Sequence, residues 1–155
     1  MKLDLPKFIG SILLCFLTGV LGSFFTASAI TTWYADLSKP LFSPPNYIFA
    51  PVWTILYVLM GISLYLLWTS NKKGREKAIR LFLIQLALNF FWSIIFFGMH
   101  SPRLAFVEII LLWAFIFLTI RASLPVSKTA AYLLYPYLAW VTFATVLNLF
   151  IAILN

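Results

Sequence analysis

WYADLSKPLFSPPNYIFAPVW, residues 33–53, stands out in a chain that is otherwise a succession of apolar segments. Its prolines lie at positions 40, 44, 45 and 51. Because proline lacks a backbone donor and fixes φ, we expect an ordered, non-helical connection over about 30–45 and a helix from about Asn46. Such a backbone cannot lie bare in lipid. It has to pack over protein at one membrane face, where it is a candidate lid.

The composition sets the class of protein. Of 155 residues, 63% are hydrophobic and 10% are charged, which is more apolar than a soluble domain of this size. Five apolar runs are long enough to cross about 30 Å of hydrocarbon. They cover about 6–29, 46–69, 79–99, 103–122 and 129–153. We therefore expect an all-α integral membrane protein, a bundle of five transmembrane helices, with residues 1–155 as a single domain.

The basic residues orient this bundle. With five spans, the amino terminus and the loops at 70–80 and 121–128 share one side of the membrane. That side holds Lys2, Lys7, Lys72, Lys73, Arg75, Lys77, Arg80, Arg121 and Lys128. The other side holds Lys39 and Arg103. The positive-inside rule then predicts a cytoplasmic amino terminus and an external carboxyl terminus. Topology and anionic lipid explain the net charge of +7, so no nucleic-acid partner is expected.

The first apolar run imitates a signal peptide, because a lysine-bearing start leads through it to Ala27-Ser28-Ala29. It is longer than an ordinary signal core, and we interpret it as the first transmembrane helix. Within it Gly19, Ser23 and Ala27 recur every four residues. Such a strip of small side chains lets another backbone approach closely.

A polar stripe runs along the third apolar segment. Gln85, Asn89 and Trp92 are four and three residues apart, so they share one helical face. Unpaired amides are costly in hydrocarbon, and this face must therefore point into the bundle. Two interpretations stay open: hydrogen bonds between helices, worth about 1 kcal/mol or less each, or the wall of a cavity.

Two other segments carry aromatic faces at helical spacing. These faces consist of Trp53, Tyr57, Met60 and Gly61 in the second run, and of Trp140, Ala144, Leu147 and Asn148 in the last. Pro136 should kink the last run just before its aromatic face. A small alanine between an indole and an amide leaves room for a ligand, but tight helix packing produces the same pattern.

The ionisable groups in the apolar runs are few. Glu108 lies about one turn inside the fourth run, where Arg103 or His100 could pair with it near the membrane surface. His100 is the sole histidine, and Cys15 is the sole cysteine. We expect no metal site and no intramolecular disulfide, and we interpret Cys15 as a small buried hydrophobic residue.

The alternating helix directions bring the polar and aromatic faces to one depth beneath the proline-rich connection. The residues expected in this outer half are Ser23, Thr26, Trp53, Asn89, Trp92, Val107, Leu147 and Asn148, with Trp140 and Ala144 somewhat deeper. An apolar pocket with a few amides and a lid suits a flat, largely hydrophobic ligand.

Three runs carry a family resemblance: WYADLSKPLFSPPNYIFAPVWTILYVLMG (33–61), QLALNFFWSIIFFG (85–98) and LLYPYLAWVTFATVLN (133–148). They resemble the sequence blocks of the tryptophan-rich sensory protein family, also called the translocator protein or peripheral-type benzodiazepine receptor family. The resemblance spans essentially the whole chain. It implies a five-helix bundle, commonly dimeric, that binds porphyrins such as protoporphyrin IX and haem, and isoquinoline carboxamide or benzodiazepine-type drugs. No cofactor is required, since the porphyrin is ligand or substrate.

The resemblance also implies a set of pocket residues under the connection at 30–45. The family's positions fall on Ser23, Thr26, Tyr34, Pro44, Phe49, Ala50, Trp53, Asn89, Val107, Trp140, Ala144 and Leu147. Some bacterial members degrade bound porphyrin in light, a reaction attributed to tryptophans that match Trp53 and Trp140. A photoexcited porphyrin stacked on an indole can exchange an electron with it, so these two are the candidate photochemical residues.

The chain departs from the animal members at the end of the last run. There those members continue with a tyrosine and an arginine in a proposed cholesterol motif, whereas residues 146–153 read VLNLFIAI. The departure argues against cholesterol transport and favours a bacterial cell membrane.

Three classes of function follow. The first is a receptor or sensor that binds porphyrin, with or without light-driven breakdown, and the alternative is a transporter of porphyrin or another lipophilic molecule. Transport needs access from both membrane faces, and the sequence shows no inverted repeat or pair of broken helices that would supply it. The third class is a structural membrane subunit with its aromatic faces packed shut. Conventional catalysis has only Glu108 and His100 as acid–base candidates, without a paired nucleophile.

Overall fold

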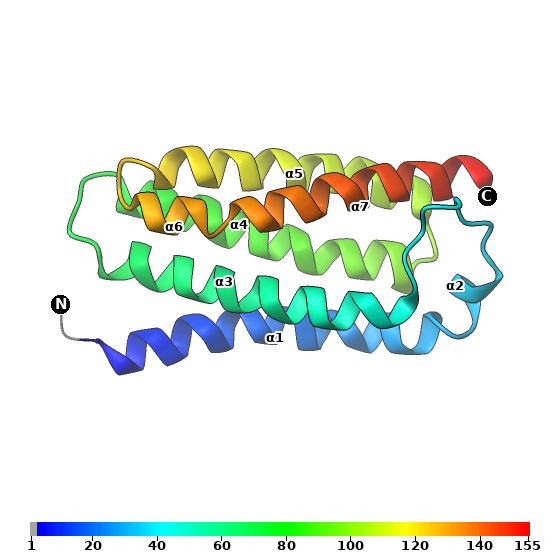
Figure 1. Cartoon of the computed structure of the whole chain (residues 1–155), viewed down its shortest axis with the longest axis horizontal. Helices are drawn as coiled ribbons and strands as arrows, with labels where there is room; N and C mark the ends of the chain where they lie inside the picture. The colour runs from blue at the N-terminus through cyan, green and yellow to red at the C-terminus, as the bar shows by residue number, and fades with distance from the viewer. Residues whose placement is uncertain (1–2) are drawn as a thin grey trace.

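A computed structural model describes residues 3–155 and contains, in that range, five helical spans long and apolar enough to cross a membrane (Figure 1). The spans are Leu5–Ala29, Asn46–Thr69, Arg75–Gly98, Pro102–Ser123 and Lys128–Leu154. The same residues form no β-strand. The predicted all-α, five-helix membrane architecture is therefore confirmed.

Most spans are single helices with short irregular additions. The elements are α1 (Leu5–Ala29), α2 (Trp33–Asp36), the 3₁₀ turn η1 (Asn46–Ile48), α3 (Phe49–Thr69), α4 (Arg75–Ser93), the π-helical turn η2 (Ile94–Gly98), α5 (Pro102–Ser123), α6 (Lys128–Tyr132) and α7 (Tyr135–Leu154). In Figure 1, α1 lies beside α3, and α5 lies beside α7. The helix directions alternate along the chain, so the bundle has two distinct ends. We call them the amino-terminal end, with the loops after α3 and α5, and the lid end, with residues 30–45 and Asn155.

Local chemistry fixes the helix starts. Asp4 caps α1 by accepting a hydrogen bond from the Lys7 backbone N–H at 3.3 Å. The Lys7 side chain, whose Nζ lies 3.2 Å from Oδ2 of Asp4, lowers the pKa of that carboxyl. Proline opens α5 at Pro102, where its missing N–H would have had no helical partner. Pro51 is likewise the third residue of α3 and leaves that helix unbroken.

Two predicted boundaries are wrong. The connection over 30–45 contains the one-turn helix α2, because its first residues, up to Lys39, include no proline. The third span begins at Arg75 rather than at 79, directly after Gly74, whose φ of 91° permits a sharp turn. Its first turn carries charged side chains that extend beyond the apolar run, and an apolar count therefore misses it.

The predicted break in the last span is confirmed. α6 ends at Tyr132, α7 begins at Tyr135, and Pro136 lies in the first turn of α7. A proline in that place removes a backbone donor and its ring clashes with the carbonyl four residues earlier. The break lets α7 start in a new direction towards the lid end.

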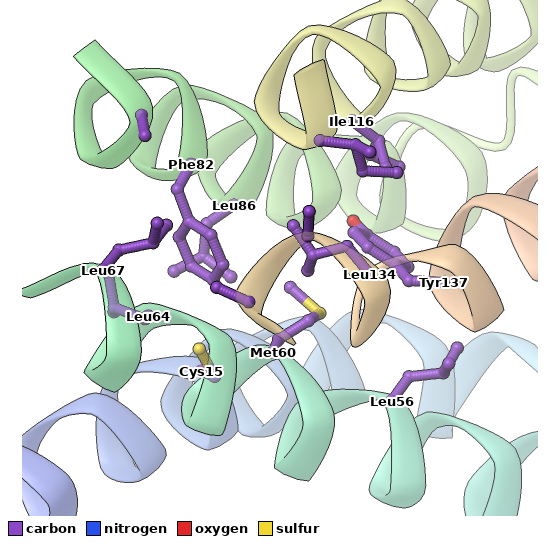
Figure 2. Close-up of a cluster of buried hydrophobic side chains, with 14 of the residues drawn as sticks. Cys15, Leu56, Met60, Leu64, Leu67, Phe82, Leu86, Ile116, Leu134 and Tyr137 are labelled. Atoms are coloured by element: carbon purple, nitrogen blue, oxygen red, sulfur yellow. The ribbon is translucent and has the colours of Figure 1, made fainter. Parts of the chain in front are cut away.

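Close packing fills the amino-terminal half of the bundle (Figure 2). Met60 of α3, Phe82 of α4 and Tyr137 of α7 are each completely buried there. The Cys15 side chain is also fully buried among them and carries no disulfide, which confirms its interpretation as a small core residue. The glycines of α1 and α3 allow close contact between these two helices. A Cβ at Gly61 would lie only 2.8 Å from the Cα of Ile12.

We expect Gly61→Ala to destabilise the bundle by about 1–3 kcal/mol, because the added methyl meets backbone that cannot yield without moving α1. Gly10→Ala is the matched control, since its Cβ would meet nothing nearer than Trp68 Cζ3 at 3.8 Å. The control should leave stability unchanged or raise it by up to about 1 kcal/mol through helix propensity. Thermal unfolding in detergent micelles measures both. Equal midpoints for the two variants would contradict the close approach at Gly61.

Candidate functional site

A cavity of about 490 Å³ occupies the lid half of the bundle. All five spans and the lid contribute to its wall, which is mainly aromatic and aliphatic with a few hydroxyl and amide groups. Its volume lies within the roughly 300–1,000 Å³ that is usual for small-molecule sites. We expected the polar and aromatic helix faces to meet at one depth because the helix directions alternate. They do meet there, and a cavity lies between them.

Most of the predicted pocket residues lie together in this wall. Those that line the cavity are Ser23, Thr26, Tyr34, Phe49, Ala50, Trp53, Asn89, Trp140, Ala144 and Leu147. Contact of these residues with a ligand stays a prediction, but their side chains surround a single cavity.

Two predicted residues lie elsewhere. Val107 is 64% exposed on the lipid-facing side of α5, and that helix lines the cavity with Ile109 and Leu112 instead. Two residues along an α-helix differ in direction by about 200°, so the correct depth did not give the correct face. Pro44 belongs to the lid but does not line the cavity, which the lid reaches through Ile30 and Tyr34.

Several wall residues were not predicted from the sequence. They include Phe16, Asn46, Phe96, Phe97, Ile109, Leu112, Val141 and Ile151. Helical spacing could have found two of them, because Phe96 follows Trp92 and Ile151 follows Leu147 by four residues. Phe97 joins Phe96 in the wall where α4 gives way to the π-helical turn η2, a change that periodicity does not reveal.

A chain of hydrogen bonds forms the floor of the cavity. The Tyr57 hydroxyl donates to Oδ1 of Asn89 at 2.8 Å, and Nδ2 of Asn89 donates to the Tyr137 hydroxyl at 2.9 Å. These bonds join α3, α4 and α7 at one level. Trp53 stacks on Tyr57 with ring centres 5.5 Å apart. Both interpretations of the polar stripe therefore hold for Asn89, which bridges helices and lines the cavity.

A second link joins three helices closer to the lid. Trp92 donates its indole N–H to Oδ1 of Asn148 at 3.1 Å, and Nδ2 of Asn148 donates to the Pro102 carbonyl at 2.8 Å. Trp92 also stacks on Phe96 at 4.9 Å. The polar stripe thus faces the bundle interior, as expected. Gln85 is 1% exposed, and neither end of its amide finds a partner within residues 3–155.

The lid is held together by its own hydrogen bonds and is tied to the bundle at the end of α7. Nζ of Lys39 donates to the carbonyl oxygens of Tyr34 at 2.6 Å and Leu37 at 3.1 Å. Asn155 and Ser38 exchange two hydrogen bonds of 3.0 Å and 2.9 Å, which tie the lid to the end of α7. Tyr34 is 3% exposed, and this burial raises the pKa of its phenol. The lid is an ordered cover over the cavity.

The expected pairing of Glu108 is wrong. Both of its carboxylate oxygens are buried, and no group in residues 3–155 bonds to them. His100 instead stacks on Trp33 of the lid, with ring centres 4.5 Å apart and planes 10° from parallel. Neither His100 nor Glu108 lines the cavity. Over the same described residues, no three His, Cys, Asp or Glu side chains gather where they could hold a metal ion.

Fold and cavity together define a multi-pass membrane protein with a cavity in one half of its helix bundle. Comparison with known proteins agrees, since the sequence profile of the TspO/MBR family matches residues 11–154. The chain belongs to the TspO/MBR family. It is 45% identical over 153 residues to the tryptophan-rich protein TspO of Archaeoglobus fulgidus, which covers 99% of both chains. It is 43% identical over 130 residues to the translocator protein of Homo sapiens, covering 82% of this chain and 77% of the human one.

A third relative is the tryptophan-rich sensory protein of Cereibacter sphaeroides. The identity is 37% over 116 residues, which cover 75% of this chain and 72% of the relative. The family resemblance of the three sequence blocks is thus confirmed, and membership of this family supports a role as a membrane receptor or sensor.

We expect Tyr137→Phe to destabilise the protein by about 1 kcal/mol or more, because it leaves Nδ2 of the buried Asn89 without an acceptor. The substitution keeps the ring, so it isolates the hydroxyl. Tyr47→Phe, at a residue that is 77% exposed, is the matched control and should have no effect. Thermal unfolding in detergent gives the comparison. A Tyr137→Phe protein as stable as the control would show that the bond to Asn89 contributes nothing.

Proposed function

We propose that this protein is a membrane receptor that binds a flat, largely apolar molecule in the cavity beneath the lid, with porphyrins such as protoporphyrin IX or haem as the first candidates. The observation that carries the proposal is the cavity of about 490 Å³ with the indoles of Trp53 and Trp140 in its wall. Isoquinoline carboxamide and benzodiazepine-type drugs share the flat aromatic shape and suit the same space.

The geometry of the wall favours a planar aromatic ligand. Trp53 stacks on Tyr57, and Trp140 makes an edge contact with Phe49 at 6.0 Å. Aromatic faces prefer offset or edge contacts with other rings, and each such contact is worth about 0.5–1.5 kcal/mol. The amide of Asn89 and the hydroxyls of Ser23 and Thr26 supply the small number of polar groups that orient a ligand in an apolar site.

The packing argues for a receptor rather than a transporter. The amino-terminal half of the bundle is filled by a continuous buried core that includes Leu64, Phe82 and Ile116 (Figure 2). A porphyrin could leave at that end only if this core came apart. The alternative of transport therefore needs a second conformation, whereas reception needs only the cavity and its lid.

We also propose that the amino-terminal end faces the cytoplasm. Among the described residues, Lys7 and the basic side chains of 72–80, Arg121 and Lys128 lie at that end, whereas Lys39 and Arg103 lie at the lid end. The positive-inside rule supports this orientation, which puts the lid on the outer face of a cell membrane.

The test is a titration of protoporphyrin IX into the purified protein in the dark, followed by tryptophan quenching. We expect saturable binding. Trp53→Phe and Trp140→Phe should each weaken it about two- to tenfold, which corresponds to the loss of about 0.5–1.5 kcal/mol of aromatic contact. Trp68→Phe is the matched control, because Trp68 lies at the amino-terminal end and does not line the cavity. Quenching without saturation, or an equal effect of all three substitutions, would contradict the proposal.

If the bound porphyrin also reacts in light, the candidate electron donors are Trp53 and Trp140, two of the three tryptophans in the cavity wall. An indole can give one electron to a photoexcited porphyrin, and the reduced porphyrin can pass it to molecular oxygen as superoxide. The indole radical cation then takes an electron back from the porphyrin ring, and the porphyrin radical cation combines with superoxide, so that oxygen is the net oxidant and the ring is bleached. We expect porphyrin bound to the wild type and to Trp68→Phe to bleach in light faster than porphyrin bound to Trp53→Phe or Trp140→Phe. The absorption spectrum of each saturated complex, in air and without oxygen, measures this. Equal bleaching in all four proteins would leave a receptor without photochemistry.

A further inference from the structure

The cavity wall is incomplete on one side. Among the residues that line it, the exposed ones are Val20, Ser23, Asn46, Ala50 and Thr54. All of them belong to α1 or to the start of the second span, and the lining residues from α4, α5 and α7 are buried or half-buried. A side chain that touches both the cavity and the outside marks a thin or open wall. The cavity therefore reaches the surface between α1 and α3, at the place that we call the α1–α3 seam (Val20, Ser23, Ala50 and Thr54).

The seam lies at membrane depth. Val20 and Ser23 precede the end of α1 at Ala29 by nine and six residues, which puts them about 14 Å and 9 Å below that end. Thr54 lies five residues into α3, at a similar depth of about 8 Å. A hydrocarbon core about 30 Å thick would cover all three positions. The opening thus faces lipid tails in one leaflet rather than water.

The two helices are tightly packed only below the seam. Gly61 lies against Ile12, and Gly19 lies so close to the Tyr57 ring that a Cβ there would clash with it. Above these contacts the facing side chains are small: Ser23 on α1, and Ala50 and Thr54 on α3. The glycine contacts therefore hold the two helices together at a level beneath the seam, and no large side chain fills the seam itself.

The two hydroxyl side chains at the rim of the seam are already hydrogen-bonded. Oγ of Ser23 donates to the Val20 carbonyl at 2.6 Å, and Oγ1 of Thr54 donates to the Ala50 carbonyl at 2.8 Å. Because both hydroxyls bond within their own helices, the rim offers no unpaired donor to lipid or to a passing ligand. The apolar ring system of a ligand can therefore cross it at little cost.

The route from water past the lid is more firmly closed than the α1–α3 seam. The lid is tied to α7 through Asn155 and Ser38, and Phe42 packs edge-on against Phe150 with ring centres 5.3 Å apart. Lys39 holds the backbone of α2 together by its bonds to Tyr34 and Leu37. A ligand that entered past the lid would have to break several of these contacts.

We propose that the ligand enters and leaves the cavity sideways, from the lipid of the leaflet at the lid end, through the α1–α3 seam. This inference rests on the proposed function and names the class of ligand more closely: a lipophilic molecule that first dissolves in the bilayer. Ser23, Ala50 and Thr54 are then the residues that set how large a molecule can pass, while the lid shields the cavity from water.

The test closes the seam and the lid separately. Cys15→Ala removes the native thiol, and Ser23→Cys with Thr54→Cys then allows a short, reducible bis-thiosulfonate cross-link across the seam. Protoporphyrin IX is the probe, and stopped-flow tryptophan quenching in lipid nanodiscs gives its association and dissociation rates. We expect cross-linking to slow both rates by about tenfold or more relative to the same double-cysteine protein before cross-linking, and reduction to restore them, because this comparison keeps the substituted wall residues the same and blocks only the route.

The matched control locks the lid instead. Phe42→Cys with Phe150→Cys, in the same background, ties the lid to α7 outside the cavity, and its cross-link should leave both rates unchanged. Slower rates with the lid locked and normal rates with the seam locked would overturn the inference in favour of entry from water. Unchanged rates in both cross-linked proteins would also overturn it.

A second pair of variants avoids cross-linking. Ala50→Trp narrows the seam and should slow association, whereas Ile55→Trp, on the lipid-facing side of the same helix, should not. The association rate is the readout, because Ala50 also lines the cavity and its substitution changes the bound state. Equal rates for these two variants would contradict the seam as the route. Failure of the proposed function has a different signature: the unlinked protein would then show no saturable binding of protoporphyrin IX at equilibrium.

Discussion

The hydrocarbon of a bilayer offers no water to a polar side chain, and this constraint positions the helices of the bundle. Asn89 satisfies its amide by lying between the hydroxyls of Tyr57 and Tyr137. Because each partner belongs to a different helix, the bonds hold α3, α4 and α7 in one register. The floor of the cavity exists at the level where this register is set. Trp92 and Asn148 repeat the arrangement nearer the lid and bring in α5 through the Pro102 carbonyl.

The side-chain packing differs between the two sides of this floor, where 'above' means towards the lid end. Below it, large apolar side chains interlock and the glycines of α1 and α3 bring two backbones into contact. Above it, aromatic rings stand around open space, and small residues occupy the contact between α1 and α3. Close packing is thus concentrated at the amino-terminal end of the bundle, and the lid end contains the cavity. Family membership and this division of the bundle point to the same role, that of a membrane receptor.

The parts of this structure that could be predicted from the sequence are those governed by length and by the cost of burying polar groups. Long apolar runs have to be spans, Pro136 has to break a helix, and Asn89 has to face inwards. The face of a residue without such a requirement is harder to predict. Val107 lies in the lid half but faces outwards, because an apolar side chain carries no polar group that would have to point into the bundle. The predicted pairing of Glu108 with Arg103 or His100 was also wrong. The His100 ring stacks on Trp33 instead, and no polar group in the described residues lies within hydrogen-bonding distance of the Glu108 carboxylate.

The uneven packing gives the two halves of the bundle different mechanical properties. Lateral pressure from lipid at the amino-terminal end acts on close-packed side chains, which have little room to yield. The same pressure at the lid end acts directly on the walls of a hollow. The lid half is therefore the more compressible part of the bundle, and the amino-terminal half is the stiffer one.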